Sequence, residues 1–207
     1  MSSTSNLIIV MVGAHGSGKS TLGRRLAQAL SIPFEPELGE LMRRKALQRS
    51  PQAHAACSQP AFDECLFQAE LERDHHLRLS SNACVVETWH PGNLAYAEKR
   101  SPHIVAQFLP TVRETCMQLQ GRVWVQPLSI SRETLRQRQH EPGPAEEAEG
   151  EAFTQFLLEV GESAPRWAIS LGLEVLPTLC TDQLDPDACV ERILERLAPL
   201  LTVKATP

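Results

Sequence analysis

One segment near the start of the chain limits what this sequence can fold into: residues 13–20, GAHGSGKS. It follows a short apolar run, Leu7 to Val12, whose unbroken hydrophobicity is typical of a strand buried on both faces of a parallel sheet. It precedes residues 19–30, where leucines recur every fourth position and predict an amphipathic helix. The order of strand, glycine-rich loop and helix therefore indicates an α/β protein.

The same loop carries the strongest chemical signal, because it matches the phosphate-binding pattern GxxxxGK[ST] in full. Its glycines leave room for backbone amides to converge on a polyphosphate, and the start of the following helix adds the positive end of its dipole. Lys19 can reach the β and γ phosphates, Ser20 can hold Mg²⁺ through its hydroxyl, and Thr21 can donate to a phosphate oxygen. We therefore predict that ATP with Mg²⁺ is bound by Gly13, Ala14, His15, Gly16, Ser17, Gly18, Lys19, Ser20 and Thr21. A folded loop that binds nucleotide without turnover stays open as an alternative.

The rest of the chain alternates short apolar runs with segments of helical periodicity, and no internal repeat interrupts this order. Further strands are predicted at 32–34, 83–86, 122–126 and 173–176. Helices are predicted at 38–48, 61–79, 102–119, 131–139, 153–171 and 185–197, and Gly161 and Pro165 are candidate kink sites. Residues 50–60 and 141–150 have the composition of loops, and 90–93 (HPGN) that of a turn. This alternation predicts a single α/β domain around a parallel sheet.

Composition excludes several other classes of protein. With 207 residues, 42% hydrophobic and 22% charged, the chain has the make-up of one ordinary globular domain. Its formal net charge of −5 argues against nucleic acid or an anionic membrane as a partner. The longest apolar run near the N-terminus is too short for a membrane span, so we expect a cytoplasmic protein. The oligomeric state stays open, a homodimer included.

Neither the cysteines nor the histidines indicate a metal or disulfide site. The six cysteines are scattered without CxxC spacing, and we expect free thiols packed as small apolar groups. His75 and His76 are adjacent, unlike ligands placed one helical turn apart.

Acidic residues follow the second and third predicted strands: Glu35 and Glu37 after the second, Glu87 after the third. Ligands of open parallel sheets bind at the carboxyl ends of the strands. A carboxylate there could hold the water shell of Mg²⁺ or accept a proton from an attacking hydroxyl. Glu35 and Glu87 are therefore candidate catalytic residues, Glu87 with Ser20 is the candidate metal site, and Glu37 is a candidate substrate-binding residue. A solvated acid is the alternative for each, and a helix cap is a further one for Glu35.

Three arginines, Arg132, Arg136 and Arg138, precede the Pro/Gly/Glu-rich segment 141–150. Phosphoryl transfer spreads negative charge over the equatorial oxygens, and arginines that close over it stabilise this charge and exclude water. We expect these three arginines and Lys19 to act in catalysis; a solvated helix face is the alternative. On a helix, 132 and 136 share a face and 138 points elsewhere.

Together these features resemble the P-loop nucleoside and nucleotide kinases, and among them the deoxynucleoside kinase and thymidylate kinase branch. The resemblance covers nearly the whole chain, although only the phosphate loop is specific. It implies that the glutamate of Glu35-Pro36 acts as base toward the acceptor, that Gln68 reads the acceptor, and that Glu87-Thr88-Trp89 takes the place of an acidic-Arg motif. It further implies a P-loop NTPase three-layer sandwich: a five-stranded parallel sheet of order 2-3-1-4-5 with helices on both faces. Residues 1–207 would form one kinase-like domain with a lid at about 131–150.

The chain departs from this family at two strand ends. Thr88 stands where the family has arginine, which removes a contact to phosphate or acceptor. No aspartate ends the strand at 122–126, so Glu87 is the better candidate for the magnesium shell. Trp89 could stack on an aromatic acceptor or pack in the core, and the sequence does not decide between the two.

The leading hypothesis is an ATP-dependent kinase that transfers the γ-phosphoryl group to a nucleoside, nucleotide or similar metabolite. The alternative is an ATPase or nucleotide-dependent switch without a small-molecule acceptor. A third hypothesis, a kinase of nucleic-acid ends, requires a basic groove, and the only notable basic cluster, residues 43–45, is typical of a solvated helix face. The sequence does not identify the acceptor.

Overall fold

The fold is built on a parallel sheet whose order is β2-β3-β1-β4-β5. A computed structural model describes residues 6–49, 60–138 and 147–203. The strands are β1 (Ile8–Gly13), β2 (Phe34–Glu35), β3 (Cys84–Glu87), β4 (Val123–Ser129), β5 (Glu174–Val175) and β6 (Leu179–Cys180). The predicted order is confirmed. The short β6, which pairs with the end of β4, was not predicted, because two residues carry no periodicity.

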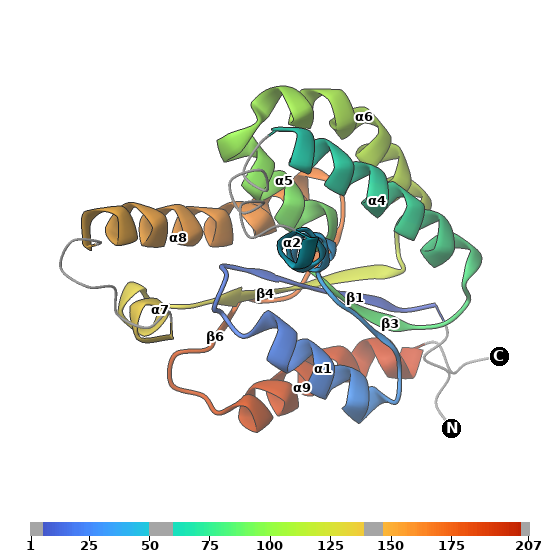
Figure 1. The fold of residues 1–207 in the computed structure, drawn as a ribbon. Helices are drawn as coiled ribbons and strands as arrows, with labels where there is room; N and C mark the ends of the chain where they lie inside the picture. Colours follow the sequence, from blue (N-terminus) through green and yellow to red (C-terminus); the bar gives the residue numbers. More distant parts are fainter. Residues whose placement is uncertain (1–5, 50–59, 139–146, 204–207) are drawn as a thin grey trace.

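Helices cover both faces of the sheet, as predicted (Figure 1). On one face lie α1 (Lys19–Leu30) and α9 (Pro186–Val203), which contact each other. On the other lie α4 (Pro60–Leu79), α5 (Trp89–Arg100), α6 (Pro102–Gln118) and α8 (Glu147–Ser170). Two further helices, α2 (Leu38–Arg49) and α7 (Arg132–Arg138), follow β2 and β4. Among the described residues, no helix is long and apolar enough to cross a membrane.

Strand β1 occupies the centre of the sheet and joins its two cores. Ile8, Val10 and Val12 pack into the core beneath α4, α5, α6 and α8. Ile9 and Met11 pack into the core shared with α1 and α9. All six residues of β1 are buried, which explains why its sequence is a continuous apolar run rather than an alternating one. Burying each of these side chains contributes about 1.5–3 kcal/mol, so the strand that carries the glycine loop is firmly fixed.

The prediction of a turn at 90–93 is wrong, because these residues lie at the start of helix α5. The helix starts immediately after β3 because its first two side chains are anchored across the core. Trp89 Nε1 donates to Asp74 Oδ1 at 2.7 Å, and His90 Nε2 lies 2.6 Å from Asp74 Oδ2. These buried contacts outweigh the local Pro-Gly signal.

The proline and glycine of this segment fit the helix start for separate reasons. Pro91 lies in the first turn, where a backbone N–H has no helical acceptor. Gly92 packs against Thr88, and a Cβ there would lie 2.5 Å from Thr88 Cγ2. Residues that indicate a turn in the sequence are thus required here by packing.

Several other predicted boundaries also differ from the structure. Helix α8 starts at Glu147, so the last residues of the predicted loop 141–150 are helical, and Gly161 and Pro165 lie inside this single helix. Residues 50–59 and 139–146, most of the two predicted loops, lie outside the described residues. The described cysteines are free thiols (Cys65, Cys84, Cys116, Cys180 and Cys189).

Candidate nucleotide site

The loop between β1 and α1 has a backbone that only glycine accommodates. Gly13 has a φ of +148°, and a Cβ there would lie 2.5 Å from the carbonyl oxygen of Leu128 on β4. Gly16 and Gly18 also have positive φ values, +83° and +95°. The loop therefore exposes backbone amides where side chains would otherwise intrude.

Lys19 is the first residue of α1, and its side chain turns back over the loop. It is 5% exposed, and Nζ donates to the carbonyl oxygens of Gly13 and Ala14 at 3.1 and 3.0 Å. Burial lowers the pKa of Lys19 below its ordinary 10.5, while the carboxylates of Glu37 and Glu87 oppose this shift. The ammonium group is thus held inside the loop between two acids, where it can turn to a phosphate.

Ser20 and Glu87 meet as expected from the rule that carboxyl ends of parallel strands converge. Ser20 Oγ donates to Glu87 Oε1 at 2.6 Å, and Glu87, the last residue of β3, is buried. A hydroxyl and a carboxylate oxygen are hard ligands of the kind that Mg²⁺ takes, with water completing its shell. This pair could therefore hold a magnesium ion that accompanies a nucleotide.

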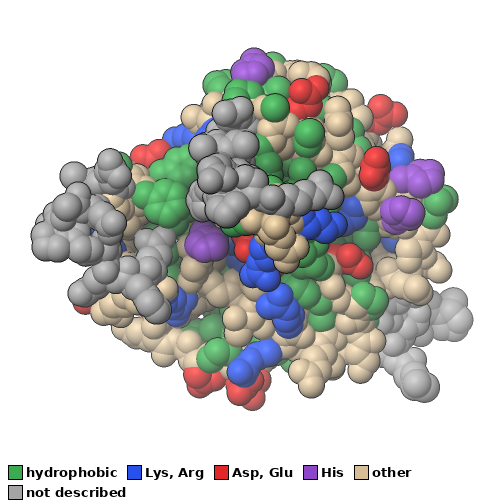
Figure 2. Space-filling model, viewed as in Figure 1, with side chains coloured by type: hydrophobic (Ala, Val, Ile, Leu, Met, Phe, Trp, Pro, Cys, Tyr) green, Lys and Arg blue, Asp and Glu red, His purple; other side chains and the backbone are tan. Residues whose placement is uncertain are grey.

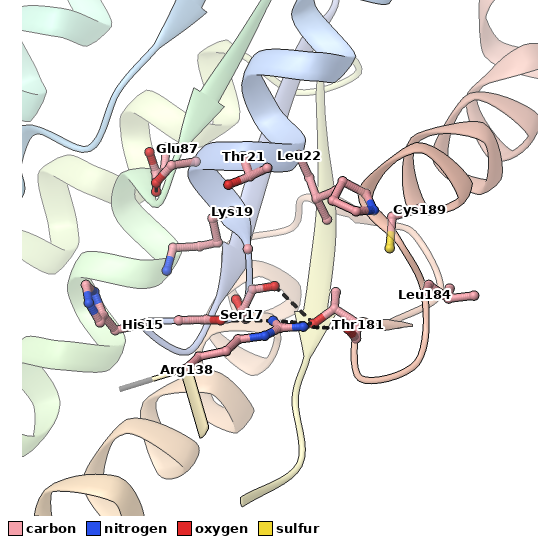
Figure 3. Close-up of a pocket in the computed structure, with 14 residues that line it drawn as sticks. His15, Ser17, Lys19, Thr21, Leu22, Glu87, Arg138, Thr181, Leu184 and Cys189 are labelled. Carbon is pink, nitrogen blue, oxygen red and sulfur yellow. Dashed lines mark hydrogen bonds between the residues drawn. The ribbon is translucent and has the colours of Figure 1, made fainter. Parts of the chain in front are cut away.

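A cavity of about 460 Å³ opens over the loop and the start of α1. In Figure 3, His15, Lys19 and Glu87 lie at one end of the cavity, and Leu184 and Cys189 lie at the other. Ser17 Oγ is buried beneath the loop and has no hydrogen-bond partner among the described residues. Residues 15–22, 87, 138, 181, 184, 186 and 189 line the cavity. A polar end with amides and a cation, joined to a partly apolar end, fits a nucleotide with its phosphates on the loop.

Glu35 and Glu37 lie at different places, although only Pro36 separates them in the sequence. Glu37 Oε2 accepts a hydrogen bond from Thr88 Oγ1 at 3.0 Å, and its Oε1 accepts one from Arg43 Nη2 at 2.9 Å. Glu35 lies in register with Val86 inside the sheet. Since Thr88 directly follows Glu87, Glu37 is the residue of this pair that the structure brings to the loop.

The three arginines after β4 divide as helix geometry predicts. Arg132 and Arg136 both pair with Glu151 on α8. Arg138 lies beside the loop, where it donates to the carbonyl oxygens of Gly16 at 3.1 Å and of Thr181 at 2.8 Å. In the described structure, Arg138 lines the cavity, whereas Arg132 and Arg136 are held by Glu151 of α8.

Two predicted substrate-binding residues do not face the cavity. Trp89 is fully buried and packs in the core against α4, so it is a packing residue and offers no face to an acceptor. Gln68 lies on an exposed position of α4 and is not among the residues that line the cavity. The sequence did not indicate Arg43 or Thr181, since an arginine in a basic run and a threonine after a short strand have no distinctive pattern.

A family model described as an AAA domain matches residues 8–159. The chain belongs to the AAA domain family. The match runs from β1 into α8 and so includes the loop, Glu87, Arg132, Arg136 and Arg138. No curated protein matches this AAA domain chain.

Solved structures similar to this AAA domain chain include several kinases with a P-loop. A shikimate kinase from Aquifex aeolicus has a TM-score of 0.52 and 17% identity, over 94% of this chain and 98% of that chain. A deoxyadenosine kinase from M. mycoides with bound dCTP has a TM-score of 0.61 and 15% identity, over 93% and 100%. The NadR protein in complex with NR has a TM-score of 0.60 and 19% identity, over 93% of this chain and 52% of that chain. At these identities the likeness shows a shared P-loop kinase fold.

Proposed function

We propose that this protein is a P-loop phosphotransferase that moves the γ-phosphoryl group of MgATP to a small-molecule acceptor. The observation that carries the proposal is the contact between Ser20, the second residue of α1, and Glu87 at the end of β3, at 2.6 Å, beside the buried Lys19. The glycine loop, the Ser20–Glu87 pair and the Lys19 side chain thus meet at one end of one cavity. The kinase folds of the similar structures support this proposal.

Each group has a definite task in the proposed reaction. Lys19 and the first amides of α1 would bind the β and γ phosphates, and Ser20 with Glu87 would hold Mg²⁺, which neutralises charge on the transferring group. Arg132, Arg136 and Arg138 would stabilise the equatorial oxygens after Arg132 and Arg136 leave Glu151. A carboxylate after β2 would orient the acceptor. We further propose that residues 1–207 act as one domain in the cytoplasm, where ATP is available.

The test is ADP release in MgATP with and without a panel of nucleosides, nucleotides, sugars and hydroxy acids. The proposal expects at least one compound to raise ADP release, and Lys19→Ala to abolish the effect while circular dichroism shows a folded protein. Slow hydrolysis that no compound accelerates would instead favour the ATPase or switch. Unchanged turnover in Lys19→Ala would refute the active-site assignment.

A further inference from the structure

Beside Glu87, but outside the residues that line the cavity, lies a carboxylate held in place by two donors. The side chain of Glu37 is only 13% exposed, and it accepts hydrogen bonds from Thr88 Oγ1 at 3.0 Å and from Arg43 Nη2 at 2.9 Å. An ionised carboxylate has about four lone-pair positions, so two are left for another donor. Glu37 therefore keeps acceptor capacity while its position is fixed.

The backbone at Thr88 is strained in the direction that makes this contact. Thr88 has a φ of +70° and Trp89 one of +47°, both in the left-handed region that β-branched and bulky residues rarely adopt. Such strain costs of order 1–3 kcal/mol and persists where surrounding contacts enforce it. Here the Thr88 amide donates to the carbonyl oxygen of Met11 on β1, and its hydroxyl donates to Glu37. The turn after Glu87 thus places a hydroxyl donor against Glu37.

Arg43, the arginine closest to this group, is already neutralised. Its guanidinium contacts Glu37 through Nη2 and Glu40 through Nε, the latter at 3.4 Å. It also lies over the ring of Phe62, 5.8 Å from the centroid. The two carboxylates largely offset the positive charge of Arg43, so it is not free to bind a phosphate dianion. Its contribution is to hold Glu37.

Each of the other basic side chains described on α2, α4 and α5 either has a hydrogen-bond or ion-pair partner or is exposed to solvent. Arg73 pairs with Glu70 at 2.5 Å, and Arg100 pairs with Asp63 at 2.5 Å. Lys45 is exposed and lies two residues beyond Arg43, about 200° around the helix. The remaining pairs are Arg44 with Glu40, Lys99 with Glu159 and Arg78 with Gln118. In the view of Figure 2, Lys and Arg side chains are interspersed with Asp and Glu and form no broad basic field.

The chemistry of this side distinguishes two classes of acceptor. A phosphate acceptor carries a charge of about −1.5 to −2 at neutral pH, needs cations free to bind it, and is repelled by carboxylates. A hydroxyl acceptor needs a carboxylate to receive its proton. On this side the described residues supply the carboxylates of Glu37 and Glu87. Each buried or half-buried Lys or Arg described on α2, α4 and α5 has an acidic partner.

We propose that the acceptor is an alcohol rather than a phosphate, and that Glu37 is the residue that receives the proton of its hydroxyl group. This inference rests on the proposed phosphotransferase function. In the step, the alcohol oxygen forms a bond to the γ-phosphorus and the bond from that phosphorus to the β,γ-bridging oxygen breaks. ADP leaves with the electron pair, and the hydroxyl proton moves to the Glu37 carboxylate. Thr88 and Arg43 are positioning residues for Glu37.

The experiment compares matched pairs of compounds, each alcohol against its phosphate ester: nucleosides against their 5′-monophosphates and sugars against sugar phosphates. ADP release in MgATP is measured for the wild type. We expect an alcohol to accelerate it and its phosphate ester not to. Acceleration by the phosphate alone would overturn the inference and leave the proposed function standing, whereas no acceleration by any compound would overturn both.

Variants then test the residue assignment with the alcohol that works. Glu37→Gln should lower kcat about 100-fold or more while the Kd for MgADP stays within about twofold. Glu40→Gln, which also removes a partner of Arg43, is the matched control and should stay within about threefold. A kcat for Glu37→Gln near that of the wild type, or the large loss in Glu35→Gln instead, would overturn the assignment.

A second pair of variants keeps the assignment testable if Glu37→Gln does not fold. Thr88→Val keeps the shape of the side chain but removes the donor to Glu37, while Thr88→Ser keeps the donor. We expect Thr88→Val to lower kcat/KM for the alcohol about tenfold, the loss of one hydrogen bond to a charged group, and Thr88→Ser to retain most of it. Equal activity of the two variants would count against the role of Thr88.

Discussion

Replacing Lys19 by methionine should separate nucleotide binding from stability. In the free protein, Nζ makes two hydrogen bonds to loop carbonyls, at 3.1 and 3.0 Å, and lies buried near Glu37 and Glu87. Hydrogen bonds to a charged group contribute about 1.5–3 kcal/mol each, while burying an ammonium costs several kcal/mol. These terms oppose each other, so we expect the unfolding free energy of Lys19→Met to stay within about 2 kcal/mol of the wild type.

With ATP bound, the same ammonium would make two such contacts to phosphate oxygens. Their loss of roughly 3–6 kcal/mol should weaken ATP binding at least about 100-fold, measured by calorimetry with Mg²⁺ present. Urea denaturation gives the stability of both proteins in the same buffer. An ATP affinity within threefold of the wild type would refute the placement of phosphates at Lys19.

The pH dependence of this variant gives an independent measure. The folded-state pKa of Lys19 is lowered by burial, so the unfolded chain binds more protons between that lowered pKa and the ordinary 10.5. Wild-type stability should therefore rise relative to Lys19→Met as the pH increases through this window. A constant difference between the two proteins from neutral pH to about 10.5 would contradict the burial of the ammonium.

Three further variants test the structure around the site. Gly13→Ala should lower the unfolding free energy by about 2–4 kcal/mol, since it adds backbone strain and an overlap with Leu128. Gly121→Ala is the control, because Gly121 has a φ of +78° with open space around it, and its unfolding free energy should fall by only about 1 kcal/mol. Equal losses of unfolding free energy in urea melts would refute the overlap at Gly13. Glu151→Gln should release Arg132 and Arg136 and tighten ATP binding by at most about fivefold, because the pairs are partly exposed. A weaker ATP affinity in calorimetry would mean that Glu151 does not compete for these arginines.

Much of the fold follows from local sequence because the central strand and the loop have strong patterns. The run from Ile8 to Val12 is apolar on both faces, and the sheet indeed buries both. Helix α5 was missed because Trp89 and His90 are fixed by Asp74, 15 and 16 residues earlier, and a local pattern contains no trace of that contact.

The candidate site is likewise only partly predictable from the sequence. The loop and the convergence of Ser20 with Glu87 follow from the strand-loop-helix order, which any parallel sheet imposes. The sequence could not decide between Glu35 and Glu37, because the decision depends on Thr88 and Arg43, which lie 51 and 6 residues away. The basic run that contains Arg43 is typical of a solvated helix face, and only its contact with Glu37, just before α2, shows that it can hold this carboxylate.

The most direct test of the account is to follow the phosphoryl group itself. The wild type is incubated with Mg²⁺, ATP labelled at the γ-phosphate and the panel of alcohols with their phosphate esters, and the labelled products are separated. We expect the label on the oxygen of an alcohol, formed at a rate that Lys19→Met abolishes. Label found only in inorganic phosphate, at a rate that no compound changes, would contradict it.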